Sequence, residues 1–202
     1  MISPSFRIAC CCCCLTFSLQ AFAQSTVVPS LAIHSIKIDG TDLELHVADP
    51  KLSFGSVAVS PDGKLLAFDS WPASGFDQSK QSIHICELTG KKIRKLSLGA
   101  MPKWSPDGDM LAFHEYLKLK GSLVIELSGD GRELITEKKG SPFWTNGGKS
   151  LAMLDWGLSN VTFQEMGSGK QTSLRDYPIQ QINHGFCISP DGKTMCLSLI
   201  HI

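Results

Sequence analysis

The chain has 202 residues, and its 19 basic and 19 acidic side chains give a formal net charge of zero. That balance excludes strong electrostatic attraction to nucleic acid or to an acidic membrane surface, so we expect no nucleic-acid partner. Hydrophobic residues make up 43% of the sequence and charged residues 19%, which excludes a disordered chain. The length predicts one domain, or at most two small ones.

Residues 1–23 have the pattern of a secretory signal peptide. Arg7 gives a short positive start, residues 8–19 form an apolar stretch, and Ala-Phe-Ala at 21–23 supplies the small residues of a cleavage site. The apolar stretch is shorter than the roughly 20 residues that a membrane-spanning helix needs. We therefore expect cleavage after Ala23, a periplasmic or secreted protein, and no transmembrane segment.

The cysteines divide into two groups at that cleavage site. Five of the eight, residues 10–14, lie in the expected signal peptide, and only Cys86, Cys187 and Cys196 remain after it. An odd number does not indicate a disulfide scaffold, so at least one thiol is expected to stay free. Lipidation at Cys10 stays open as an alternative. We expect no bound metal and no cofactor.

A tight-turn motif repeats along the rest of the chain. Ser-Pro-Asp-Gly begins at residues 60, 105 and 189, and a degenerate Thr-Asn-Gly-Gly copy begins at 145, so the spacings are 45, 40 and 44 residues. Proline presets φ and glycine supplies the left-handed residue of a hairpin turn, which favours a structural role over a catalytic one. The predicted structural turn residues are Pro61, Asp62, Gly63, Pro106, Asp107, Gly108, Pro190, Asp191 and Gly192.

Apolar segments flank each turn, and a second hairpin follows it. The second hairpins are predicted at 82–88 with 93–98, 122–127 with 133–136, and 161–166 with 172–175. Four strands in a repeat of about 40 to 45 residues are typical of a β-propeller blade. After each turn a small residue recurs, which indicates close approach of neighbouring sheets. These small residues are Ala67, Ala112, Ala152 and Cys196.

The predicted fold is therefore all-β, a propeller of four-stranded antiparallel blades. A linker at 24–30 precedes the repeats at 31–202, which divide into a half blade (31–50), three blades (51–99, 100–139, 140–178) and a complementary half blade (179–202). Pairing of the two halves would close a ring of four blades and remove exposed sheet edges. The alternative is that the chain is a fragment of a larger propeller.

The segments VAVSPDGKLLAF (57–68) and PKWSPDGDMLAF (102–113) resemble the repeat of TolB-type propellers, which are relatives of WD-repeat proteins. The resemblance covers most of residues 31–202. It implies an exported or periplasmic propeller, commonly of six or more blades, that acts as a protein-binding scaffold. The same repeats form the accessory propeller of prolyl-oligopeptidase-like enzymes. The chain departs from the namesake of the family, which carries a further α/β domain ahead of its propeller.

No catalytic motif is complete. A G-x-S-x-G sequence is absent, residues 167–171 lack the first glycine of a phosphate loop, and His114-Glu115 lacks the second histidine of a zinc protease, where Lys118 stands. The six histidines are scattered and are interpreted as structural. We therefore predict no catalytic, cofactor-binding or metal-binding residues.

A ligand-binding rim is predicted where the second strand of each blade ends. Trp71, Tyr116 and Trp156 align there, with Asp69, Glu115 and Asp155 beside them. Aromatic rings with carboxylates could form a platform for a protein, a peptide or a sugar. The alternative is that the rings pack between blades.

We interpret the chain as a non-enzymatic protein-interaction scaffold that binds a protein or peptide partner. A small-molecule or sugar ligand stays open. The rival hypotheses are a propeller-type hydrolase or lyase whose rim carboxylates act as acid and base, and a fragment without independent function.

Overall fold

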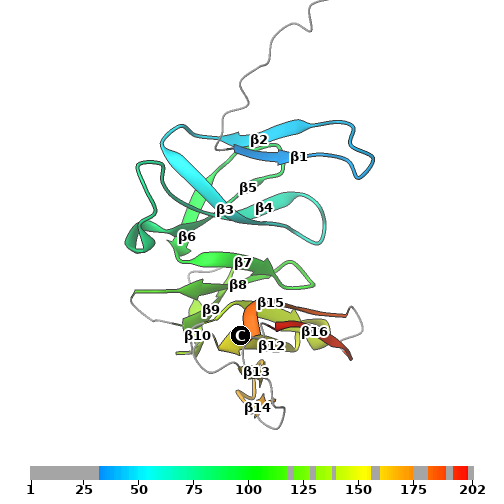
Figure 1. The fold of residues 1–202 in the computed structure, drawn as a ribbon. Coiled ribbons are helices and arrows are strands. Elements are labelled where there is room, and N and C mark those ends of the chain that lie inside the picture. The colour runs from blue at the N-terminus through cyan, green and yellow to red at the C-terminus, as the bar shows by residue number, and fades with distance from the viewer. Residues whose placement is uncertain are drawn as a thin grey trace, which may run out of the picture. The chain divides into compact units, whose positions relative to one another are not determined.

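The computed structural model describes residues 32–117, 121–127, 131–137, 140–155, 160–174, 182–189 and 193–199. In these ranges the chain forms β-strands and two short 3-10 helices, and no helix there is long and apolar enough to cross a membrane. Most of these residues are in three four-stranded antiparallel sheets and two hairpins, each a meander in chain order (Figure 1). The predicted all-β fold is confirmed.

The first sheet contains β3 (Leu52–Val59), β4 (Leu65–Pro72), β5 (Ser82–Glu87) and β6 (Arg94–Leu98), with a 3-10 helix at Gln78–Lys80. The second contains β7 (Ala100–Trp104), β8 (Met110–Glu115), β9 (Gly121–Glu126) and β10 (Arg132–Thr136). The third contains β11 (Pro142–Thr145), β12 (Ser150–Asp155), β13 (Asn160–Glu165) and β14 (Gln171–Ser173). The hairpins are β1 (Ala32–Ser35) with β2 (Glu44–Ala48), and β15 (Ile182–Ile188) with β16 (Met195–Leu199).

The repeated turn is held by its own aspartate. In the first copy, Asp62 Oδ1 accepts hydrogen bonds from Ser60 Oγ at 2.7 Å and from Lys64 N at 3.1 Å, and Gly63 has φ 71°. These bonds lower the pKa of Asp62, and the same arrangement lowers that of Asp107 in the second copy. Pro190, Asp191 and Gly192 of the third copy lie outside the described residues. The degenerate copy forms a 3-10 turn at Asn146–Gly148 instead.

Neighbouring sheets pack face to face through the small residues. Ala67 packs in a cluster with Trp104, Leu111 and Phe113 of the next sheet. Ala112 packs in a cluster with Leu151 and Met153 of the third sheet. Ala152 packs in a cluster with Phe186 of the β15–β16 hairpin. All three alanines are fully buried. A larger side chain at these positions would separate the sheets, because protein interiors are close-packed.

Two tryptophans add a hydrogen bond between consecutive sheets. Trp104 Nε1 of β7 donates to the carbonyl oxygen of Ala58 in β3 at 3.0 Å. One sheet later, Trp144 Nε1 of β11 donates to the carbonyl oxygen of Lys103 in β7 at 2.9 Å. Each bond joins the first strand of one sheet to the first strand of the sheet before it, so the same kind of contact recurs at both interfaces.

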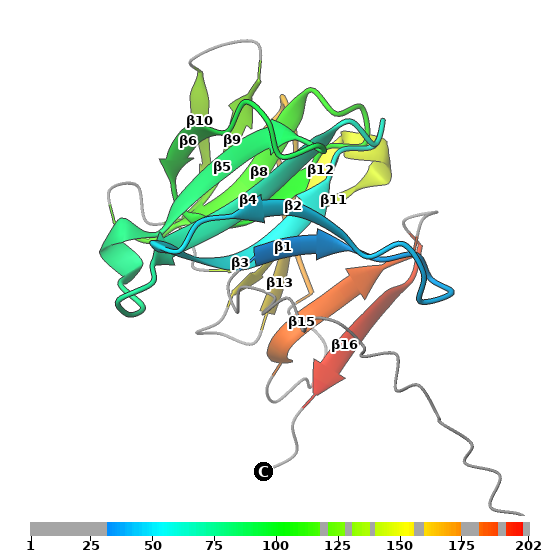
Figure 2. The same cartoon turned by 90° about the horizontal axis from the view of Figure 1, so that it is seen from above.

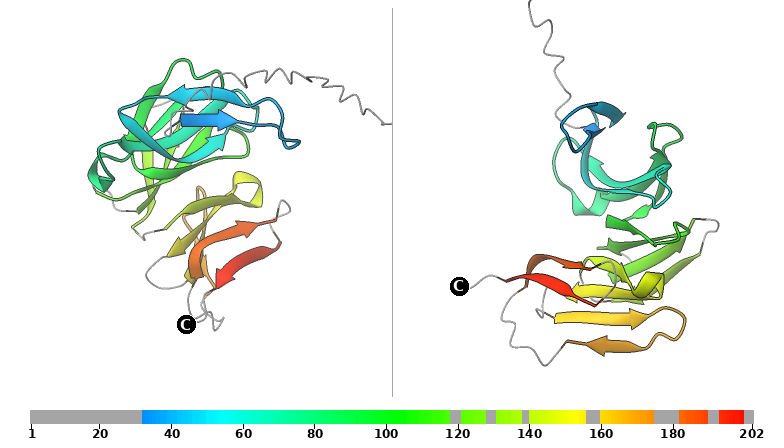
Figure 3. Two further views of the ribbon diagram at one scale, coloured as in Figure 1. Left: turned by 45° about the horizontal axis from the view of Figure 1, so that its top comes forward. Right: turned by 90° about the vertical axis from the view of Figure 1, so that its right-hand side faces the viewer.

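The two hairpins pack on the sheets next to them in the chain. Ile33 and Val47 of the β1–β2 hairpin lie in one cluster with Leu66 and Phe68 of β4. The β15–β16 hairpin lies beside the third sheet (Figures 2 and 3). Its Phe186 packs in one cluster with Ala152, Leu154 and Val161 of that sheet. Among the described strands the hairpins are separate two-stranded sheets, so the pairing that would close a ring of four blades is not observed there.

Replacing the inter-sheet donor should weaken the fold. Trp104→Phe leaves the Ala58 carbonyl unpaired in the interface, so we expect the free energy of unfolding to fall by about 1–3 kcal/mol. Urea denaturation followed by circular dichroism measures this loss. The matched control is Trp71→Phe, because the ring of Trp71 packs on Phe76 in the loop that follows β4. Equal losses in both variants would contradict the role of the Trp104 hydrogen bond.

Candidate functional site

The centre of the predicted rim is the buried carboxylate of Asp69. It lies near the end of β4 on the same face as Ala67, since alternate strand residues share a face, and it therefore faces the second sheet. Its Oδ2 accepts a hydrogen bond from Met101 N at 2.8 Å, and its Oδ1 accepts one from Gln81 Nε2 at 3.3 Å. The residue is 1% exposed. Asp69 thus joins the first two sheets through a polar contact.

Two β-bulges bring backbone to this carboxylate. The register of β3 shifts between Phe54 and Val57, and that of β7 shifts between Ala100 and Lys103. The second shift contains Met101, whose φ of 59° is left-handed and unusual for a residue other than glycine. Bulges are common where a strand must redirect a group toward a site. Here the bulge in β7 directs a backbone N–H at Asp69.

The first bulge contains Gly55, where the absence of a side chain matters. A Cβ at this position would overlap Oδ1 of Asp69 and lie 2.8 Å from the ring of Trp71. Glycine therefore allows β3 to approach both rim residues of β4. The Trp71 ring packs edge-to-face on Phe76, with centroids 5.4 Å apart.

Glu115 enters the same interface from the opposite side. It is 3% exposed and lies at the end of β8 on the face that carries Leu111 and Phe113, which pack against the first sheet. When β8 is compared with β4 position by position, Glu115 takes the place of Ser70, which is one residue beyond Asp69. Because of this offset, Asp69 and Glu115 project from facing sheets toward one interface.

Tyr116 follows Glu115 and contacts a buried histidine. Its ring lies edge-on to the ring of His114, with centroids 4.5 Å apart. Burial raises the pKa of the Tyr116 hydroxyl, and the negative charge of Asp69 raises it further. His114 is fully buried.

Trp156 and the side chain of Asp155 lie outside the described residues, so the third part of the rim is not placed. Gln81 and Met101, which complete the surroundings of Asp69, were not predicted from the sequence. Gln81 follows the loop of the 3-10 helix and gives no motif, and the role of Met101 comes from its backbone. Nothing in their residue types signals a site.

The polar contacts of Asp69 determine what the site can do. Burial raises the pKa of this carboxyl group, while hydrogen bonds from Met101, Gln81 and Ser56 oppose the shift. The Oε1 atom of Gln81 is buried and makes no hydrogen bond in the described part of the chain. Across the same ranges, no three histidine, cysteine or acidic side chains come close enough to hold a metal ion. The arrangement supplies a buried acid and a spare acceptor.

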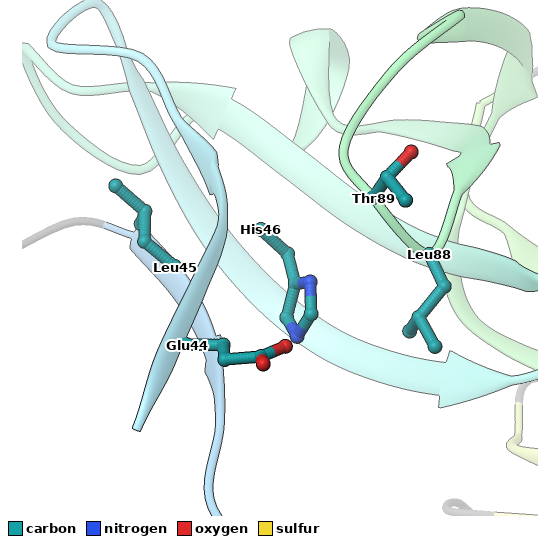
Figure 4. Close-up of a pocket in the computed structure, with 5 residues that line it drawn as sticks. All are labelled: Glu44, Leu45, His46, Leu88 and Thr89. Carbon is teal, nitrogen blue, oxygen red and sulfur yellow. The ribbon is translucent and has the colours of Figure 1, made fainter. Parts of the chain in front are cut away.

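A second feature is a surface hollow beside the β1–β2 hairpin. Its volume is about 440 Å³, and Glu44, Leu45, His46, Leu88 and Thr89 line it (Figure 4). The Nε2 atom of His46 lies 2.7 Å from Ser35 Oγ, which holds the ring against the neighbouring strand. The hollow is mainly apolar, with a carboxylate and a hydroxyl at its edge. No motif in the sequence singles out these residues.

Substitution of Asp69 should separate hydrogen bonding from charge. Burial raises the pKa of Asp69 above its ordinary value of 3.8, so the folded state favours the protonated carboxyl group. This contribution to stability is fully present below pH 3.8 and is lost as the pH rises through the raised pKa of the folded state. Asp69→Asn keeps an acceptor for Met101 and offers a donor to Gln81 Oε1. We therefore expect the Asn variant to gain stability relative to the native chain as the pH rises from below 3.8.

Urea unfolding at a series of pH values measures this difference. The control is Asp69→Ala, which leaves the Met101 N–H unpaired and should cost about 1–3 kcal/mol even at the lowest pH. A difference between the Asn variant and the native chain that stays constant with pH would contradict the raised pKa.

No protein-family model matches the sequence, and no curated protein matches it. Solved structures do match its fold. TolB from Acinetobacter baumannii superposes with a TM-score of 0.66 at 19% identity, over 82% of this chain and 42% of that one. A putative TolB from Agrobacterium tumefaciens gives 0.62 at 19% identity, over 83% and 61%. An oligogalacturonate lyase in complex with manganese gives 0.62 at 13% identity, over 82% and 52%.

At these identities the likeness concerns the fold alone. The chain spans about half the length of the structures that it matches. The part of the chain that superposes with the two TolB structures includes most of the three four-stranded antiparallel sheets, since the match covers 82% and 83% of this chain. The chain therefore has the fold of a TolB-like β-propeller.

Proposed function

We propose that this protein is an exported, non-enzymatic interaction module that binds a protein or peptide. The observation that carries the proposal is the β1–β2 hairpin, in which four large apolar side chains are more than half exposed. They are Ile36, Ile38, Leu43 and Leu45. Exposed apolar residues gathered in one place mark interaction surfaces more often than scattered ones do. The loop between β1 and β2 projects beyond the strand ends (Figure 1).

The hollow beside this hairpin supports the same proposal. Leu45 and Leu88 offer apolar walls, and Glu44 and Thr89 offer acceptors and a donor at the edge. An apolar side chain of a bound peptide would contact the apolar walls of this hollow, and the few polar groups at its edge would set the orientation of the peptide, as in other binding sites. We call the four apolar residues and this hollow the hairpin surface.

Binding through the hairpin surface is testable with selected peptides. A displayed library of random peptides is selected on the full chain, and the affinities of the winners are measured by calorimetry. We expect the double variant Ile38→Ser, Leu43→Ser to weaken binding by roughly tenfold or more, since truncating central interface residues has such effects. The control is Phe76→Ser, which removes an apolar side chain that is 64% exposed in another loop.

Two outcomes would overturn this use of the hairpin. One is unchanged affinity in the double variant, and the other is an equal loss in the Phe76 control. Circular dichroism of each variant shows that it remains folded.

Export follows from the pattern of residues 1–23. Expression with an intact secretion machinery should yield a protein that begins at Gln24, because cleavage after Ala23 follows the small residues of the predicted site. N-terminal sequencing of the exported fraction measures this. An uncleaved chain that stays in the cytoplasm would contradict export, and a lipid-modified cysteine at the N-terminus would support lipidation in its place.

A second candidate function is a propeller-type hydrolase or lyase. The observation in its favour is that two buried carboxylates, Asp69 and Glu115, face one interface and that the pKa of Asp69 is raised. One structural neighbour is an oligogalacturonate lyase, so incubation of this chain with oligogalacturonate distinguishes the two functions. Product formation that is lost in Asp69→Asn would favour the enzyme.

A further inference from the structure

We propose that Cys187 and Cys196 form a disulfide across the β15–β16 hairpin. The two residues are direct Cα partners in the antiparallel register, between the pairs Phe186 with Leu197 and Ile188 with Met195. Direct partners in such a ladder point to the same face of the sheet. The inference rests on this register and is independent of the proposed interaction function.

The backbone spacing suits the bond. Direct partners in antiparallel strands have Cα atoms about 4.5 or 5.5 Å apart, depending on the hydrogen-bonding of the pair. Disulfides span Cα separations of about 4.4–6.8 Å. Ser189 and Thr194 form a hydrogen-bonded pair, so Cys187 and Cys196, two positions further on, form one as well. The Cα spacing of about 5.5 Å in such a pair lies in the disulfide range, and a small approach of the two Cβ atoms is needed for the sulfur atoms to join.

Hydrogen bonds at the adjoining ends of the two strands keep them aligned. Ser189 N donates to the carbonyl oxygen of Thr194 at 2.8 Å, and Thr194 N donates to Ser189 Oγ at 3.0 Å. Cys187 and Cys196 lie two positions beyond this pair on either strand. Their thiols are therefore held near each other before oxidation, which favours an intramolecular bond over one between copies of the chain.

Exposure distinguishes this pair from the rest of the repeat. Cys196 stands where the three sheets carry Ala67, Ala112 and Ala152, which are fully buried. In contrast, Cys187 and Cys196 are both exposed and both free thiols in the structure. An oxidant in solution can reach them.

Cys86 is the unreactive member of the set. It lies in β5 with 1% of its surface exposed, packed with Leu66 and Phe68. Burial raises the pKa of its thiol, and the charge of Glu87 raises it further, so little thiolate is available for exchange. The odd number of cysteines after residue 23 thus divides into one exposed pair and one buried thiol.

The oxidant in the proposed reaction is a low-molecular-weight disulfide, such as oxidised glutathione. The thiolate of one cysteine attacks a glutathione sulfur, breaks the S–S bond and releases one glutathione thiolate, which takes up a proton. The thiolate of the other cysteine then displaces the second glutathione. Two protein thiols are oxidised to one disulfide, and one glutathione disulfide is reduced to two glutathione thiols.

Tryptic mapping of the full chain tests the bond. The protein is equilibrated in oxidised and reduced glutathione, alkylated and digested. Cleavage after Arg175 and Lys193 places Cys187 in fragment 176–193 and Cys196 in fragment 194–202, while Cys86 falls in fragment 81–91 and Cys10–Cys14 in fragment 8–37. We expect one species that joins fragments 176–193 and 194–202 and that separates on reduction.

Single variants provide the controls. Cys86→Ala should leave the joined species unchanged, whereas Cys187→Ser should abolish it and leave Cys196 as a lasting mixed disulfide with glutathione. The proposal is overturned if both cysteines in the native chain end as separate glutathione adducts or alkylated thiols. It is equally overturned if the cross-link joins two copies of the chain, which non-reducing electrophoresis detects.

Discussion

The structure depends on close approach of one sheet to the next at a fully buried small residue. Each sheet is too thin to bury its own apolar side chains, so Leu111 and Phe113 are protected from water only because Ala67 lets the sheets meet. The same contact brings the Trp104 indole within hydrogen-bond distance of the Ala58 carbonyl. Apolar packing supplies most of the stabilisation at this interface, and the hydrogen bond sets the register of the two sheets.

The polar cluster around Asp69 is a consequence of that approach. With the sheets this close, a carboxylate at the end of β4 meets the backbone of β7, and the bulge at Met101 turns an N–H toward it. A residue that would be solvated on an isolated strand becomes a buried acid with a raised pKa. The hairpin surface differs in kind, since the side chains of Ile36, Ile38 and Leu43 remain in contact with water.

Particular residues show how far prediction from sequence reaches. The SPDG spacing and the flanking apolar segments predict the strand order, and the described strands β5, β9 and β13 lie within one residue of the expected ranges 82–88, 122–127 and 161–166. Asp69 and Glu115 of the predicted rim are buried on facing sheets, and the charge of Asp69 raises the pKa of Tyr116, while the ligand-binding role of the rim stays a prediction. Gln81 and Met101 could not be predicted, because one acts from an irregular loop and the other through its backbone.

The sequence by itself determined the repeat, the turn chemistry and the alternation of strands, because these depend on interactions between residues close together in the chain. The recurring small residues predicted the covered alanines as well, whereas tertiary structure alone decided that Asp69 and Glu115 enter one interface from opposite sheets and that Cys196 is exposed. It also decided that the two terminal hairpins are separate sheets in the described part of the chain. Contacts between sheets join segments some 40 residues apart in the chain, and a local pattern does not specify which individual side chains meet across such a contact.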